Sequence, residues 1–302
     1  MEMLGFISAL PGAAAQGIIW GIMAIGVYIT YRVLDLADLT VDGTLGTGGA
    51  VLVMCTIGGM DIRLAMVVAF IAGCLAGLVT GVLHTGFGIP AILAGILTQL
   101  ALYSINLRIL GDKANQTLSV MKYDLIVSLR NIPNAIVIGL IFVIMLIAIL
   151  YWFFGTEMGH SIRATGNNAA MARANGINTN TRKVIGLVIS NGIVALSGAL
   201  LAQYQGFADV NMGKGAIVIG LAAVIIGEVV FGKIFKNFAL RLLGVVCGGI
   251  IYYVVITFVL RLGLNANDLK LFSAIVVALF LAVPYWKSKL LPKQVKVQKK
   301  GV

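Results

Sequence analysis

Long apolar runs separated by short polar segments fill the chain from about residue 12 to residue 286. A helix needs roughly 20 apolar residues to cross the hydrocarbon core of a bilayer. The pattern therefore predicts an all-α, polytopic transmembrane bundle of about nine spans, within a range of about eight to ten, forming one domain over residues 1–302. The predicted spans are 12–34, 44–60, 64–84, 89–110, 134–155, 183–205, 214–232, 239–260 and 269–286. The second is short and glycine-rich, which indicates a broken or re-entrant element.

Composition agrees with a membrane location. Hydrophobic residues make up 60% of the chain and charged residues only 11%, whereas about 25% of a soluble domain is charged. Several of the 37 glycines recur every four residues inside apolar runs, which places small residues on one helix face and lets two backbones approach. Close packing within one subunit is the favoured interpretation, and a dimer seam is the alternative. The repeats are Gly73, Gly77 and Gly81; Gly17 and Gly21; and Gly244 and Gly248.

Lysine and arginine placement predicts the orientation. The segments 156–183 and 232–241 and the basic tail 287–302 carry most of the net charge of +11, and all three fall on one side if the spans alternate. The positive-inside rule makes that side cytoplasmic, together with the C-terminus. The opposite loops carry mixed charges, such as Asp61 with Arg63 and Asp268 with Lys270. The charge thus reflects topology, and no nucleic-acid partner is expected.

Catalytic, metal and nucleotide sites are not predicted. The three cysteines and two histidines stand singly, which favours neither a metal site nor a catalytic set. Residues 227–233 have the outline of a phosphate loop, but Ile234 stands where a magnesium-binding Ser or Thr is needed. The N-terminus lacks the basic start of a secretory signal, so no cleaved segment is expected. A membrane enzyme is therefore disfavoured, and no cofactor is expected in this chain.

Several polar residues interrupt the apolar pattern. Asp35, Asp38 and Asp42 crowd the junction of the first two spans. Acids at membrane depth usually face a partner or a watery cavity, so a helix break lining a pathway is one interpretation. An ordinary turn, with Asp42 or Thr44 capping the next helix, is the other. Spacing alone leaves both open.

Two further polar groups allow similar alternatives. Gln99 and Asn106 are seven residues apart, hence on one helical face, where they either line a path or hydrogen-bond between helices. The segment 203–214 contains Asp209 and Asn211 and is either an outer vestibule or an exposed loop.

The segment 156–178 is the longest charged stretch between spans. Residues 169–174 favour helix, with Gly166 as a break and Gly176 as the expected C-cap. We interpret it as a short cytoplasmic helix that contacts a soluble partner, and a plain connecting loop is the alternative.

The stretches GHSIRATGNNAAMARANGIN (159–178) and SNGIVALSGALLAQYQGFADVNMGKGAIVIGLAAVIIGE (190–228) resemble the membrane subunit of bacterial ATP-binding-cassette (ABC) importers. They are similar to the permease family that serves branched-chain amino acids and ribose. Residues 26–51 and 88–111 resemble more narrowly a subgroup of amino-acid permeases, some linked to tryptophan or tyrosine uptake.

The resemblance implies a multi-pass protein of the bacterial plasma membrane that works with several partners. These are a second permease copy, expected as a homodimer, two cytoplasmic ATPase subunits that bind ATP and Mg²⁺, and an external solute-binding lipoprotein. It implies that Asp38, Thr40 and Asp42 lie near the path and that Asp209 and Asn211 lie on its outer side. The implied ATPase-coupling residues are Arg163, Ala164, Gly166, Asn167, Ala172, Arg173 and Gly176.

The expected function is therefore the pore-forming subunit of an importer that moves a small solute inward by alternating access. An amino acid, and an aromatic one in particular, is the expected solute. The alternative is an ion-coupled secondary transporter in which Asp35, Asp38 or Asp42 carries protons or sodium.

Overall fold

The computed structural model describes residues 2–261 and 269–290, which form eleven α-helices, one π-helical turn and one pair of short strands. The all-α, polytopic class is confirmed. The elements are α1 (Glu2–Tyr28), η1 (Ile29–Val33), α2 (Thr40–Ile57), α3 (Ile62–Thr85), α4 (Ala91–Ile109), β1 (Asn115–Thr117), α5 (Ile132–Phe154), α6 (Glu157–Asn167), α7 (Ala169–Ala174), α8 (Thr179–Gln205), β2 (Phe207–Asp209), α9 (Ala216–Phe231), α10 (Phe238–Arg261) and α11 (Leu269–Leu290).

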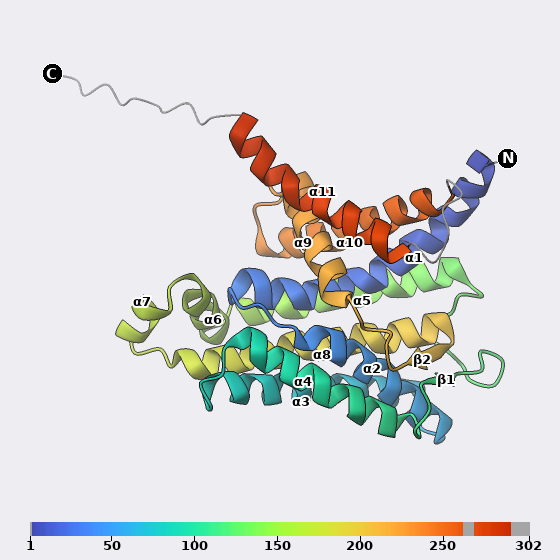
Figure 1. Ribbon diagram of the computed structural model, residues 1–302, viewed down its shortest axis with the longest axis horizontal. Helices are drawn as coiled ribbons and strands as arrows, with labels where there is room; N and C mark the ends of the chain where they lie inside the picture. The colour runs from blue at the N-terminus through green and yellow to red at the C-terminus, as the bar shows by residue number, and fades with distance from the viewer. Residues whose placement is uncertain (1, 262–268, 291–302) are drawn as a thin grey trace.

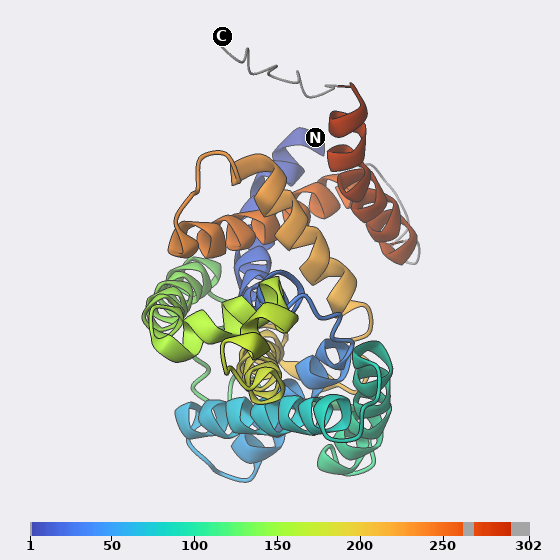
Figure 2. The same cartoon turned by 90° about the vertical axis from the view of Figure 1, so that its left-hand side faces the viewer.

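The long helices run back and forth between two ends of the molecule (Figure 1). The short helices α6 and α7 lie at one end, and the antiparallel pair β1–β2 lies at the other. Figure 2 looks onto the α6–α7 end. The predicted basic segments 156–183 and 232–241 meet there, because one cavity is lined by residues of α6, η1 and the start of α10. The tail beyond residue 290 lies outside the described residues.

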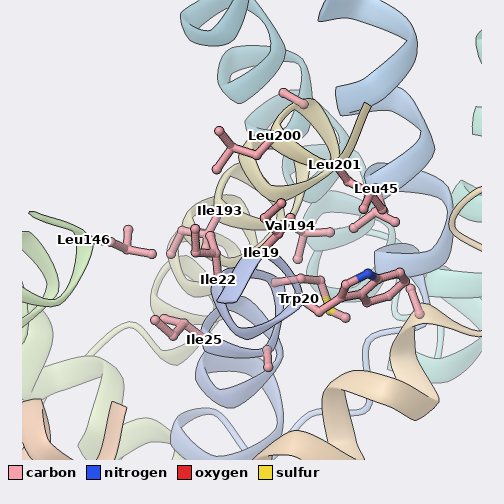
Figure 3. Close-up of a cluster of buried hydrophobic side chains, with 14 of the residues drawn as sticks. Ile19, Trp20, Ile22, Ile25, Leu45, Leu146, Ile193, Val194, Leu200 and Leu201 are labelled. Carbon is pink, nitrogen blue, oxygen red and sulfur yellow. The ribbon is translucent and has the colours of Figure 1, made fainter. Parts of the chain in front are cut away.

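The apolar core is centred on α1 and α8, which pack against each other and against neighbours on both sides. Ile19, Ile22 and Ile25 of α1 face Ile193 and Val194 of α8, all of them buried (Figure 3). Helices α2 and α3 pack on α8, while α9 and α10 pack on α1. By contrast, α4 and α5 expose rows of large apolar side chains along much of their length, as expected for helices that face lipid.

The predicted count of nine spans is not confirmed. Seven helices in the described part of the chain are long and apolar enough to cross a membrane. The apolar helix Ala216–Phe231, predicted as a span over 214–232, has only 16 residues.

Most of the regularly spaced glycines pack one helix of the chain closely against another. A Cβ at Gly77 of α3 would lie 2.3 Å from the carbonyl oxygen of Leu187 in α8. A Cβ at Gly17 of α1 would lie 2.6 Å from the Cα of Ile250 in α10. These helices pack backbone to backbone, so the interpretation of close packing within the subunit is confirmed for these contacts.

The first helix ends in an irregular segment inside the bundle. After the π-helical turn η1, Asp35 adopts a positive φ of 54° and α2 begins at Thr40. The predicted alternative of a cap from Asp42 or Thr44 is wrong for this helix. Instead, the Asp38 carboxylate accepts a hydrogen bond from the Thr40 N–H at 2.9 Å, so α2 begins four residues before the predicted span.

We expect Gly48→Ala to lower the thermal unfolding midpoint of the purified protein. The new Cβ would lie 1.9 Å from the carbonyl oxygen of Ala195, which forces α2 and α8 apart. Overpacking of this kind costs about 1–3 kcal/mol. Gly12→Ala is the matched control, because its Cβ would lie 3.9 Å from its nearest neighbours, the side chains of Ile132 and Tyr204. Equal midpoints for the two variants would contradict the packing account.

Candidate substrate cavity and coupling face

A cavity of about 270 Å³ opens between the first turn of α2, the middle of α4 and the segment that leads into α9. It combines apolar walls with a few polar groups, which is typical of a small-molecule site. Its lining residues are Asp42, Gly43, Gln99, Leu100, Tyr103, Asn106, Val210 and Lys214.

Helix α4 presents three of these side chains from one face. Gln99, Tyr103 and Asn106 follow the i, i+4, i+7 spacing of a helical stripe. Asn106 is 1% exposed, and its Nδ2 donates to the Gly43 carbonyl oxygen at 3.3 Å. Its Oδ1 has no hydrogen-bond partner among the described residues. A buried amide oxygen left unpaired is costly, and this one belongs to a residue that lines the cavity.

Asp42 joins the cavity to the start of α9. Its Oδ2 accepts from the Gly215 N–H at 2.9 Å, and its Oδ1 accepts from the Ile217 N–H at 2.8 Å. The first N–H groups of a helix have no partner within that helix, and a carboxylate also interacts favourably with the positive end of the helix dipole. Asp42 therefore caps α9 from α2, and α9 starts within the bundle.

The cavity also contains one cation and one aromatic ring. Lys214 and Tyr103 are exposed side chains at its mouth, with the Lys214 ammonium 5.5 Å from the centre of the Tyr103 ring. Sequence reasoning did not select Tyr103, Lys214 or Val210. Tyr103 could have been found, since it lies on the helical face already defined by Gln99 and Asn106.

The seven predicted pathway residues fall into three groups. Asp42, Gln99 and Asn106 line the cavity. Asp209 and Asn211 lie next to it, at the end of β2 and in the turn that follows, where the Asp209 carboxylate accepts a hydrogen bond from the Asn211 N–H. Only Val210 between them lines the cavity. Asp38 and Thr40 are buried elsewhere, in hydrogen-bond networks between helices.

The two networks join four helices. Asp38 accepts from Asn191 Nδ2 of α8 at 2.8 Å, and the Oδ1 of the same asparagine accepts from Thr44 of α2 at 2.8 Å. The Thr40 hydroxyl lies 2.7 Å from that of Thr80 in α3, which donates to Thr98 of α4 at 2.9 Å. The hydrogen bonds of Asp38 and Thr40 are thus made within the protein, so these two residues have a structural role.

The predicted coupling segment is helical, in two pieces. The predicted break at Gly166 is wrong: Gly166 lies inside α6, and the break falls at Asn168, whose side chain caps α7 by accepting the Met171 N–H. Gly166 is glycine because its Cβ would lie 1.9 Å from the Val33 carbonyl oxygen of η1. Gly176, with φ of 78°, follows α7 in the left-handed conformation that glycine favours.

The coupling residues do not share one face. Ala164, Asn167 and Arg173 are exposed, whereas Ala172 is buried. Arg163 turns inward, with its guanidinium 4.2 Å from the centre of the Phe238 ring and 5.3 Å from that of Phe154. Burial lowers the pKa of this guanidinium, but an arginine remains charged.

Sequence reasoning overlooked an apolar residue on this surface. Met171 of α7 is 65% exposed. Arg173 of the same helix is also exposed, and α7 lies at one end of the molecule (Figure 1).

The long apolar helices, the helix ends fixed inside the bundle and the cavity between them define a multi-pass membrane permease. Residues 10–284 match the family described as branched-chain amino acid transport system / permease component, and the chain belongs to that family. It is the permease component of an ABC transport system, a class whose members work with ATPase and solute-binding partners.

Relatives cover most of the chain. A tyrosine transport system permease protein of Clostridioides difficile is 41% identical over 280 residues, covering 93% of this chain and 91% of that protein. An uncharacterized protein of Rickettsia prowazekii is 33% identical over 272 residues, which cover 89% of this chain and 95% of that protein. The autoinducer 2 import system permease protein LsrC of Escherichia coli is 29% identical over 198 residues, which cover 64% of this chain and 56% of that protein.

Among solved structures, PsaBC from Streptococcus pneumoniae in complex with Fab is 15% identical and covers 85% of this chain and 95% of that one. Its TM-score is 0.42, a likeness too low to establish a shared fold.

We expect Asp42→Asn to lower the thermal unfolding midpoint, because an amide offers one acceptor oxygen to two backbone N–H groups. One N–H at the start of α9 would lose its partner, at a cost of about 1–3 kcal/mol. Asp35→Asn is the matched control, since Asp35 is exposed and asparagine tolerates its positive φ. A midpoint for Asp42→Asn that equals that of Asp35→Asn would show that the cap is unimportant.

Proposed function

We propose that this chain forms the pore of an importer that moves an aromatic amino acid, with tyrosine as the first candidate, into the cell. The observation that carries the proposal is the cavity bounded by Asp42, Gln99, Tyr103, Asn106 and Lys214. The name of the Clostridioides difficile relative supports the choice of tyrosine.

The lining matches an amino acid group by group. The Lys214 ammonium pairs with the carboxylate of the solute, and the unpaired Asn106 Oδ1 accepts from its ammonium group. The Tyr103 ring offers a face to an aromatic side chain. A volume of about 270 Å³ suits one small solute, since cavities of about 300–1,000 Å³ hold drug-sized ligands.

Energy reaches the cavity from partner subunits in this proposal. Two ATPase subunits bind ATP and Mg²⁺ and dock on α6 and α7, where Met171 and Arg173 are exposed. Their closure moves α6 and switches the packed helices between outward-open and inward-open arrangements. An external binding protein delivers the solute to the β1–β2 end.

A second copy of the chain completes the pore. Helix α4 exposes Leu93, Leu97 and Leu100 beside the cavity. A partner copy on this face would close the open side of the cavity.

We expect Lys214→Met to reduce tyrosine uptake about tenfold in proteoliposomes containing the ATPase and saturating binding protein. The variant removes a charge-assisted hydrogen bond, worth about 1.5–3 kcal/mol, from the solute carboxylate. Uptake of tyramine, which lacks that carboxylate, should not change. Lys113→Met is the control, because Lys113 is exposed and does not line the cavity. Unchanged tyrosine uptake in Lys214→Met would refute this role.

We expect Arg173→Glu to weaken binding of the ATPase and to reduce ATP-driven uptake, with the unfolding midpoint preserved because Arg173 is exposed. Arg163 is a poorer test, since a carboxylate between the Phe154 and Phe238 rings would disturb packing. Arg130→Glu, an exposed charge reversal before α5, at the other end of the molecule, is the control. Full ATPase binding by Arg173→Glu would place the docking surface elsewhere.

A further inference from the structure

A second cavity, of about 620 Å³, lies at the α6–α7 end and is separate from the substrate cavity. It is formed by the last turn of α5, the first two turns of α6 and residues 236–238 at the start of α10. These three elements lie together in the view of Figure 2. The proposed transport cycle places no solute in this cavity.

The two sides of the cavity differ in chemistry. One side is aromatic, with Tyr151 and Trp152 of α5, and Trp152 is 71% exposed. The other side presents Lys236, Asn237 and His160. The lining contains no carboxylate, and Lys236 has no ion-pair partner among the described residues. The cavity is therefore built to receive an anion that has an apolar part.

Helix α5 shows where this ligand comes from. Ile141, Ile144 and Ile149 are more than half exposed along the helix that ends at Trp152, so the cavity lies at the end of a lipid-facing surface. Tryptophan and tyrosine concentrate at the boundary between membrane and water. Tyr151 and Trp152 at the end of α5 therefore lead us to infer that the cavity opens at the level of the lipid headgroups.

The histidine has one ring nitrogen left for a ligand. His160 Nδ1 lies 2.8 Å from the Thr156 carbonyl oxygen. A carbonyl only accepts, so Nδ1 carries the proton and donates. Nε2 therefore remains for contact with the cavity and donates to an anion when the ring is protonated.

We propose that this cavity binds the phosphate headgroup of an anionic phospholipid, with its acyl chains along α5. Lys236 pairs with the phosphate, and Trp152 and Tyr151 hold the glycerol and upper acyl region. Basic pockets between transmembrane helices on the cytoplasmic side bind such headgroups. The site depends on insertion in a membrane and not on which solute is transported.

A neighbouring cavity of about 680 Å³ shares Arg163, Lys236 and Phe238 but is less suited to this ligand. Its lining includes Asp35, and the Arg32 within it is already paired with Glu228 at 2.8 Å. The carboxylate and the ion pair offset part of its positive charge, which also includes Arg241, and its lining lacks the exposed Trp152 that faces the lipid. The observations therefore favour the cavity beside α5.

Native mass spectrometry of the purified full-length protein tests the site with phosphatidylglycerol and with zwitterionic phosphatidylcholine as probes. We expect Lys236→Gln to weaken phosphatidylglycerol binding about fivefold and to weaken phosphatidylcholine binding less, because the choline group already neutralises that phosphate. Lys233→Gln is the matched control, an exposed lysine of the same loop that lies outside the cavity. Lys236 is exposed, so both variants should keep the unfolding midpoint of the parent protein.

Three results would overturn the proposal. Equal weakening in Lys233→Gln would mean that loop charge, and not the cavity, attracts the lipid. Displacement of phosphatidylglycerol by millimolar inorganic phosphate would make free phosphate the ligand. A loss of ATPase-subunit binding in Lys236→Gln, with phosphatidylglycerol binding intact, would assign the cavity to an acidic side chain of that partner.

Discussion

The structure depends on two carboxylates that satisfy backbone N–H groups where water cannot. In a bilayer every backbone polar group needs a partner within the protein, so a helix that begins inside the bundle requires an acceptor there. Asp38 supplies it for α2, and Asp42 supplies it for α9. Asn191 of α8 holds Asp38 in turn. A carboxylate exposed to lipid would cost free energy, but here the two carboxylates allow α2 and α9 to begin inside the bundle.

The cavity inherits its shape from the same constraint. Because Asp42 binds the start of α9, the segment 210–214 that precedes that helix is held against α2 and α4. Gly213 reinforces this contact, since a Cβ there would lie 1.9 Å from the Asp42 carbonyl oxygen. Both the charged mouth residue Lys214 and the apolar wall residue Val210 are thus positioned by one side chain of α2.

The sequence predicts the features that depend on local pattern. Apolar run lengths give the all-α class, and the spacing of Gln99 and Asn106 predicts a shared helical face. In the structure both predicted alternatives hold for that face, because it lines the cavity and Asn106 also hydrogen-bonds to α2. The partner of Asp42 lies about 175 residues away along the chain, and no local spacing encodes it. The predicted span count is not confirmed for a similar reason. Helix α9 is short because it starts inside the bundle, and that start depends on a tertiary contact with Asp42. The inward turn of Arg163 likewise depends on Phe238, which is distant in sequence.

The contacts of α6 connect the α6–α7 end of the molecule with the segment that leads to the cavity. Gly166 lies against the Val33 backbone, and Arg163 is held between Phe154 and Phe238, so α6 cannot move without η1, α5 and α10. After Val33 comes the irregular segment 34–39, which contains Asp38, and then the first turn of α2, which contains Asp42. A displacement of η1 therefore acts on the two carboxylates that fix α2 and α9. Packed helices change between discrete arrangements and do not deform continuously, so in the transport cycle proposed above we place the switch between open states at these carboxylate contacts.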